Sequence, residues 1–200
     1  MLPIELLRLF RLEKSIGVVI GVNHDYRHIF IGFRSTNDLF QFIAQYVVFT
    51  MGWMEDFPLG GKMVAIYVQI YKDILNFGFD ASLEQAVSLF PTYSLLVTGH
   101  SLGGAMATVF SLHVALRYPL KPVSLYAWSG PRSGDETFTV PTPHHNTFEV
   151  FYPTHMTTDN YKICNQAESE TCLKGSWWKT FFSHIFMFDM NFLNHQRMGY

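Results

Sequence analysis

The segment from Gly99 to Gly103 reads Gly-His-Ser-Leu-Gly and has the spacing of a serine nucleophile. A serine between two such glycines, at a sharp turn from a strand into a helix, is the pattern of a nucleophile elbow. Glycine is needed at both ends because a Cβ there would collide with neighbouring backbone. The turn presents the hydroxyl beside the N–H groups that open the helix. We therefore predict that Ser101 attacks an acyl carbonyl and that the Leu102 N–H helps to hold the oxyanion.

A histidine further along the chain must supply the base. A serine hydroxyl becomes a good nucleophile only when a base takes its proton, and a carboxylate fixes the tautomer of that base. In proteins with this elbow, an acid and then a histidine follow the serine along the chain. The histidines that lie well after Ser101 along the chain are His144, His145, His155, His184 and His195. His113 is set aside because it lies about three turns along the helix that the elbow opens.

The elements around the elbow alternate between strand-like and helix-like patterns, which is typical of a sheet covered by helices. Strands are predicted at residues 16–22, 28–33, 93–98 and 123–128, and helices at residues 37–46, 63–76, 82–90 and 102–118. The regular pattern fades after Gly134, where we expect mostly loop. The pattern predicts one α/β domain over residues 1–200, with a mostly parallel sheet and helices on both faces.

Three segments resemble the class 3 (fungal-type) lipase family, and they occur in the family's order. Residues 97–105 are similar to its serine segment, and residues 129–134 to its Gly-Ser-Pro-Arg-x-Gly turn. Residues 29–36 resemble its strand ending in Phe-Arg-Gly-Thr, with Ser35 in place of the usual glycine. Residues 60–62, Gly-Gly-Lys, resemble nematode members especially. The resemblance begins near residue 17 and implies an α/β-hydrolase fold that is possibly truncated.

The resemblance also implies an activity and several site residues. The activity is hydrolysis of carboxylic esters, acylglycerols in particular, through an acyl-enzyme on Ser101, with no metal or cofactor. Thr36 would be the first oxyanion residue, through its N–H and hydroxyl, and Leu102 the second. Residues 183–188 resemble the family's Asp-His-x-x-Tyr-Phe ending, which implies that His184 is the base.

The acid is where this chain departs from the family. The family places an aspartate before x-Val-Pro, whereas here Phe138 stands at the matching position, ahead of Val140 and Pro141. A strand's worth of sequence seen in the family is missing after that point. Asp135 is the weak remaining candidate, and Asp159 is the next. Asp135 also has a simpler interpretation as a turn-forming acid beside a glycine.

Loss of the acid leaves alternative functions open, because removing that carboxylate costs about ten-thousandfold in turnover. One alternative is a catalytically impaired protein that keeps the pocket and binds lipid or a protein partner. Another is a truncated product that folds poorly because an edge of its sheet is gone. The ester hydrolase remains the leading hypothesis.

Composition narrows the partners and the location. The formal net charge is −2 and the basic residues are scattered, which argues against nucleic acid as a partner. No apolar run reaches the roughly 18 residues of a membrane span, and Glu5 and Arg8 interrupt the apolar start, so we predict no signal peptide in this chain. Transient contact with a lipid surface stays possible.

The chain has two cysteines, Cys164 and Cys172, which are either reduced thiols or a disulfide that closes a short loop. They resemble one of the family's disulfides, and the family is generally secreted. The resemblance therefore implies a disulfide and an extracellular location.

Overall fold

The computed structural model describes residues 4–11, 17–34, 53–128, 130, 133–135, 138, 149–151, 162–164, 186–187 and 190–191. The chain divides into two compact units, residues 1–134 and 135–200. The first unit holds β1 (Ile4–Arg11), β2 (Gly17–Asn23), β3 (His28–Phe33), β4 (Met54–Asp56), β5 (Lys62–Val64), α2 (Ala65–Asn76), α3 (Phe79–Leu89), β6 (Ser94–His100), α4 (Leu102–Arg117) and β7 (Val123–Trp128). The prediction of a single domain stays a prediction.

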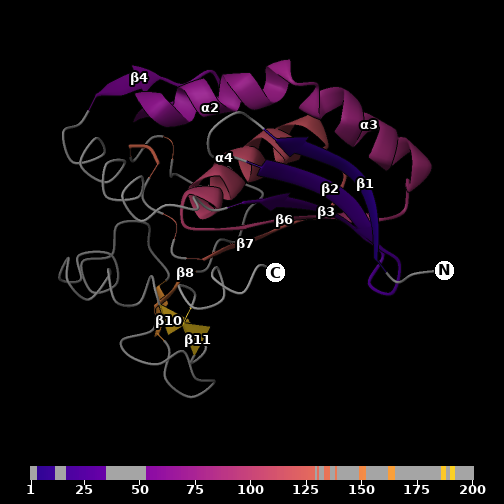
Figure 1. Ribbon diagram of the computed structural model, residues 1–200. Helices are drawn as coiled ribbons and strands as arrows, with labels where there is room; N and C mark the ends of the chain where they lie inside the picture. The colour runs from indigo at the N-terminus through magenta and orange to yellow at the C-terminus, as the bar shows by residue number, and fades with distance from the viewer. Residues whose placement is uncertain are drawn as a thin grey trace. The chain divides into compact units, whose positions relative to one another are not determined.

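One five-stranded sheet organises the first unit (Figure 1), in the order β1-β2-β3-β6-β7. Strands β1, β2 and β3 pair antiparallel, whereas β3, β6 and β7 pair parallel. The sheet is therefore mixed rather than mostly parallel, because a four-residue turn at residues 24–27 joins β2 to β3 as a hairpin. The parallel half carries the predicted elbow.

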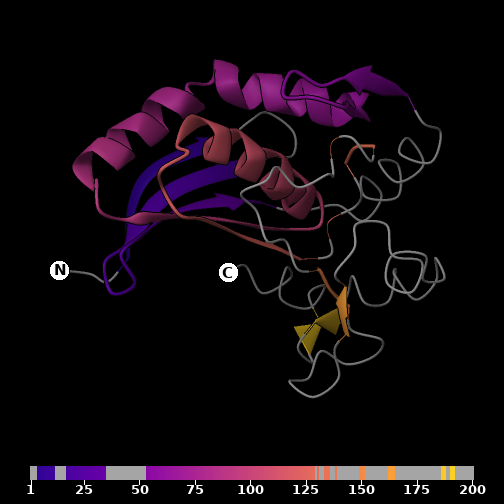
Figure 2. The ribbon, with the colours of Figure 1, turned by 180° about the vertical axis from the view of Figure 1, so that it is seen from behind.

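The three described helices lie over one face of this sheet. Every second residue of β2 is fully buried there, namely Val18, Ile20 and Val22. Figures 1 and 2 show α2, α3 and α4 on the same side of the strands, seen from front and back. Among the described residues, no helix is both long enough and apolar enough to cross a membrane. The predicted helix at residues 37–46 lies outside the described residues.

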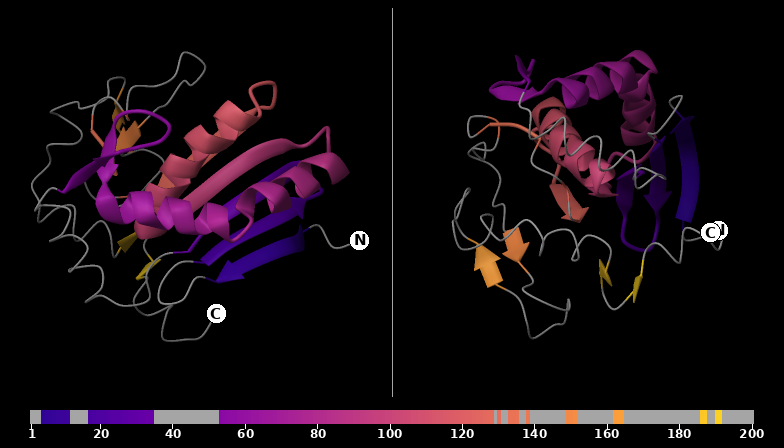
Figure 3. Two further views of the ribbon diagram at one scale, coloured as in Figure 1. Left: turned by 90° about the horizontal axis from the view of Figure 1, so that it is seen from above. Right: turned by 60° about the vertical axis from the view of Figure 1, so that its left-hand side comes forward.

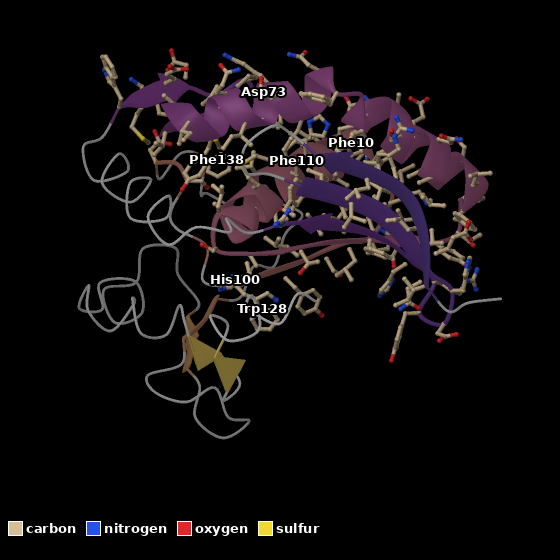
Figure 4. The ribbon with its side chains drawn as sticks, viewed as in Figure 1. Phe10, Asp73, His100, Phe110, Trp128 and Phe138 are labelled. Carbon is tan, nitrogen blue, oxygen red and sulfur yellow. The ribbon has the colours of Figure 1, made fainter. Side chains whose placement is uncertain are left out.

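Phe110 of α4 forms the centre of the core. It is fully buried, and its ring lies 5.0 Å from that of Phe33 on β3, 5.2 Å from Tyr71 on α2 and 4.7 Å from Phe79 on α3. Figure 4 shows it in the layer between α2 and the strands. Because one ring contacts three other elements, this cluster fixes how α4 lies on the sheet.

Most elements near the elbow agree with the predictions. The strand at residues 123–128 has the predicted bounds, and α4 ends one residue earlier than predicted, at Arg117. Strand β6 extends two residues further, to His100, so that it runs directly into the elbow. Helix α3 begins at Phe79, three residues early, because Gly78 takes a left-handed φ of 89° that starts a new helix directly after α2.

Two predictions were wrong. The helix predicted from residue 63 begins only at Ala65, because Lys62–Val64 instead forms β5, a hairpin partner of β4. Met63 and Val64 are buried, so their apolar character suits either structure. We also predicted no strand before residue 16, whereas Ile4–Arg11 forms β1 at the outer edge of the sheet, as Figure 3 shows.

The second unit has two short hairpins among its described residues. Strand β8 (Glu149–Phe151) pairs with β9 (Lys162–Cys164), and β10 (Phe186–Met187) pairs with β11 (Met190–Asn191). Among the described residues of this unit, these strands depart from the predicted loop.

Candidate active site

Ser101 has the backbone conformation that a nucleophile elbow requires. Its φ is 56° and its ψ is −126°, directly between the end of β6 and the first residue of α4. Among the described residues, Ser101 and Arg27 are the two non-glycine residues with positive φ. Such geometry is costly for a residue with a Cβ, by about 1–3 kcal/mol, and persists only where the surroundings enforce it. Strain at a serine between strand and helix supports a functional role for that serine.

The glycines on either side leave no room for a side chain. A Cβ at Gly99 would strike the carbonyl oxygen of Gly103, and a Cβ at Gly103 would strike the carbonyl oxygen of Phe33. Each obstacle is backbone, which cannot rotate away as a side chain can. The predicted reason for these two glycines is therefore confirmed.

Backbone hydrogen bonds hold the elbow from both sides. The Ser101 N–H donates to the carbonyl oxygen of Trp128 at 2.9 Å, and the Ser101 carbonyl accepts from the Ala105 N–H at 3.0 Å. These bonds tie the serine to the end of β7 and to the first turn of α4. The sequence does not reveal the role of Trp128, because it acts through its backbone.

The chain leaving β7 crosses close to the start of α4. A Cβ at Gly104 would lie 2.9 Å from the carbonyl oxygen of Trp128, and one at Gly130 would lie 2.9 Å from the nitrogen of Ala105. The small residues in the first turn of α4 permit this approach. Leu102 begins that turn and is 2% exposed. The N–H of a first helical residue has no helical carbonyl oxygen to donate to, so the Leu102 N–H is suited to stabilise an oxyanion.

The Ser101 side chain is enclosed, since the residue is only 1% exposed. Ser101 and Ser133 are the two buried polar residues among those that the structure describes. Solvent therefore has almost no access to the Ser101 side chain in this structure.

The structure brings together one half of the predicted site. Ser101 and Leu102 are consecutive residues of the elbow. The backbone after β3 passes close to the elbow, since a Cβ at Gly103 would lie 3.0 Å from the Arg34 carbonyl carbon. Thr36, two residues beyond Arg34, lies outside the described residues. His184, His195, Asp159 and Cys172 also lie outside them, and so does the side chain of Cys164.

Asp135 is described, and it has a local partner. Its Oδ1 accepts a hydrogen bond from the Phe138 N–H at 3.0 Å. A carboxylate that accepts from the N–H three residues ahead is the contact of a turn or helix start. Phe138, which the resemblance aligns with the family's aspartate, is 7% exposed.

A serine–histidine contact lies at the end of β6 opposite to Ser101. The Ser94 Oγ is 2.6 Å from the His28 Nδ1. Ser94 begins a regular strand, however, and its φ is not positive, so it lacks the elbow. This pair provides an internal comparison for Ser101.

His113, which the sequence disfavours as the base, has a largely buried side chain. Its Nε2 is 2.8 Å from Asp80 and its Nδ1 is 2.9 Å from the Tyr71 hydroxyl. Burial and the nearby Asp80 raise the pKa of Tyr71 to about 12. These contacts bind α4 to its neighbouring helices and leave His113 committed to a structural role.

The chain resembles known lipases over much of its length. The model of the lipase (class 3) family matches residues 30–160. A lipase from Rhizopus niveus is 34% identical over 113 residues, which cover 55% of this chain and 28% of that protein. Secreted mono- and diacylglycerol lipase 1 from Fusarium solani is 27% identical over 135 residues, covering 63% of this chain and 36% of the relative. The chain therefore matches only about a third of these relatives' length.

Solved lipase structures share the fold. Lipase II from Rhizopus niveus superimposes with a TM-score of 0.78 at 23% identity, over 94% of this chain and 82% of that one. The lipase from Rhizopus microsporus var. chinensis gives 0.77 at 21% identity, over 94% and 75%. Since the family model spans more than half of the 200 residues, the chain belongs to the class 3 lipase family and has an α/β-hydrolase fold.

Proposed function

We propose that the protein hydrolyses carboxylic esters of the acylglycerol type, with Ser101 as the nucleophile. The observation that carries the proposal is the positive φ of a buried serine between β6 and α4, enclosed by glycines that admit no Cβ. Membership of a lipase family and the names of the relatives support the substrate class.

The reaction follows from the position of the elbow. The Ser101 Oγ attacks the ester carbonyl as His184 takes its proton, and the carbonyl oxygen becomes an oxyanion. The N–H of Leu102, with the N–H and hydroxyl of Thr36, stabilises that charge. His184 then protonates the leaving alcohol, and a water molecule activated by the same imidazole releases the fatty acid from Ser101.

The remaining assignments rest on the family. We assign no triad acid, because Asp135 has a turn-forming contact and the resemblance aligns Phe138 with the family's aspartate. A Cys164–Cys172 disulfide and an extracellular location are proposed, the second supported by the name of the Fusarium relative. Lipid is the proposed partner.

Covalent labelling tests the proposal. A fluorophosphonate should label the wild-type protein at one site, and Ser101→Ala should abolish the label. Ser94→Ala is the matched control, because Ser94 also lies beside a histidine but outside an elbow, and it should label as the wild type does. The reaction is run with and without neutral detergent micelles, since Ser101 is enclosed. Labelling in neither condition, or labelling that survives Ser101→Ala, would contradict the proposal.

A turnover assay tests the substrate class. Emulsified tributyrin should be hydrolysed by the wild type and not by Ser101→Ala. Labelling without turnover of tributyrin or of p-nitrophenyl butyrate would instead favour the catalytically impaired protein that binds lipid.

A further inference from the structure

Strand β1 has one edge that no described strand covers. It pairs with β2 along its full length, from Ile4 to Arg11, and it is the last strand of the sheet. Among the described strands, none pairs with its outer side, as the end-on view in Figure 3 shows. An open edge of this kind presents a row of backbone donors and acceptors to other chains.

The two faces of β1 differ in character. Ile4, Leu6 and Leu9 are 55%, 58% and 49% exposed. They pair with Asn23, Gly21 and Val19, which lie on the face away from the helices. Three large apolar side chains in a row on an exposed edge strand favour contact with another apolar surface.

The opposite face carries two charges of opposite sign. Glu5 pairs with Val22, and Arg8 pairs with Ile20, and both of these partners lie on the face that the helices cover. Glu5 and Arg8 are three residues apart, so a regular strand would place them on opposite faces. The irregularity between Leu6 and Arg8 returns them to the same face.

The charged and apolar residues of β1 are complementary to those of a second, antiparallel copy of the same strand. If two copies of β1 meet antiparallel about a two-fold axis between Leu6 and Leu7, Glu5 of each copy faces Arg8 of the other. The same register places Ile4 opposite Leu9, on the apolar face. These two cross-strand pairs match in face and in chemistry, and each occurs twice because of the symmetry.

We propose that β1 is a self-association surface, on which a second copy of this chain adds its own β1 to form a continuous antiparallel sheet. Charges on an edge strand usually oppose such pairing. Here their signs alternate about the symmetry axis, so the charges attract in this register. Although Glu5 lies 3.5 Å from His24, half of its side chain is exposed.

Other pairings lack this match. A shift of the register by two residues would place Glu5 opposite Phe10 and would leave both charges without a partner. Strand β7, at the other edge of the sheet, has the sequence Val-Ser-Leu-Tyr-Ala-Trp and carries no charge to select a register. The charges therefore identify both the strand and the register.

Charge reversal tests the proposal by analytical ultracentrifugation at low ionic strength. The wild type should form a dimer as its concentration rises. Glu5→Arg places arginines opposite each other and Arg8→Glu places acids opposite each other, so each should weaken the dimer about tenfold or more. A mixture of these two variants should form a heterodimer, and the double variant Glu5→Arg/Arg8→Glu should form a homodimer, because both restore opposite charges.

Asp25→Arg is the matched control, because it makes the same change of charge at an exposed turn outside β1. It should dimerise as the wild type does. Circular dichroism and thermal unfolding verify that each variant is folded. A wild type that stays monomeric, or a dimer that is indifferent to Glu5→Arg, would overturn the proposal, and so would two single variants that remain monomers when mixed.

Discussion

The Nε2 atom of His113 lies 2.8 Å from the Oδ1 atom of Asp80, and this contact joins α4 to α3. The other ring nitrogen is 2.9 Å from the Tyr71 hydroxyl, so one imidazole connects the three described helices α2, α3 and α4. Its side chain is only 11% exposed. Since α4 begins at the elbow, this polar cluster steadies the helix that carries Ser101.

We expect His113→Ala to lower the free energy of unfolding by about 2 kcal/mol, because it removes a buried hydrogen bond to a charged group and a second bond to a tyrosine. Urea unfolding measures the loss. His24→Ala is the control: His24 also lies 2.9 Å from a tyrosine hydroxyl, but 3.5 Å from its acid, Glu5. It should cost less than half as much, and equal losses would contradict the role of Asp80.

Tyr71 should make the protein sensitive to alkaline pH. Its pKa rises from 10 to about 12 in the folded protein, through burial and then the charge of Asp80. A raised pKa means that the folded state holds the proton more tightly, so the stabilisation is complete below pH 10 and is lost as the pH rises toward 12. The stability advantage of the wild type over Tyr71→Phe should therefore shrink between these pH values.

Denaturant unfolding at several pH values from 9 to 11.5 measures that difference. Burial also raises the pKa of Tyr67, but both proteins contain Tyr67, so its effect cancels. Tyr26→Phe serves as the control, because Tyr26 is 73% exposed. A constant difference between wild type and Tyr71→Phe would refute the assignment.

Gly103→Ala should prevent or severely weaken folding. The added methyl group meets the carbonyl oxygen of Phe33, and a clash with backbone costs about 3 kcal/mol or more. Gly17→Ala makes the same chemical change where the nearest atom is 3.5 Å away, and should cost under about 1 kcal/mol. Thermal unfolding of the two variants compares them. Similar melting temperatures would show that the elbow is less crowded than described.

The elbow was predictable because its signal is local. Gly99, Ser101 and Gly103 lie within five residues of one another, and the obstacle that requires glycine at position 99 belongs to the same turn. The pattern of strand, turn and helix around them depends on short-range periodicity, so those elements were also correct. The helix start at Ala65 was missed because pairing between β4 and β5 overrode an apolar pattern that also suits a helix.

Strand β1 was not predicted for a different reason. The irregularity between Leu6 and Arg8 breaks the alternation by which a strand is identified, so Ile4–Arg11 has no regular period. The site was likewise predictable only in part. The carbonyl of Trp128 and the approach of Phe33 involve backbone atoms of distant segments, which leave no mark in the side-chain sequence.

Asp135→Asn should leave ester hydrolysis within about twofold of the wild-type kcat. An asparagine oxygen can still accept the Phe138 N–H, so the turn is kept while the negative charge is lost. An acid that orients the catalytic histidine would instead show a loss of about ten-thousandfold. Turnover of p-nitrophenyl butyrate measures the difference, with Ser101→Ala as the lower limit.

Asp135→Ala, which removes the acceptor altogether, should lower the free energy of unfolding by about 1 kcal/mol. A collapse of kcat in Asp135→Asn with unchanged stability would identify Asp135 as the triad acid and reverse the assignment made here.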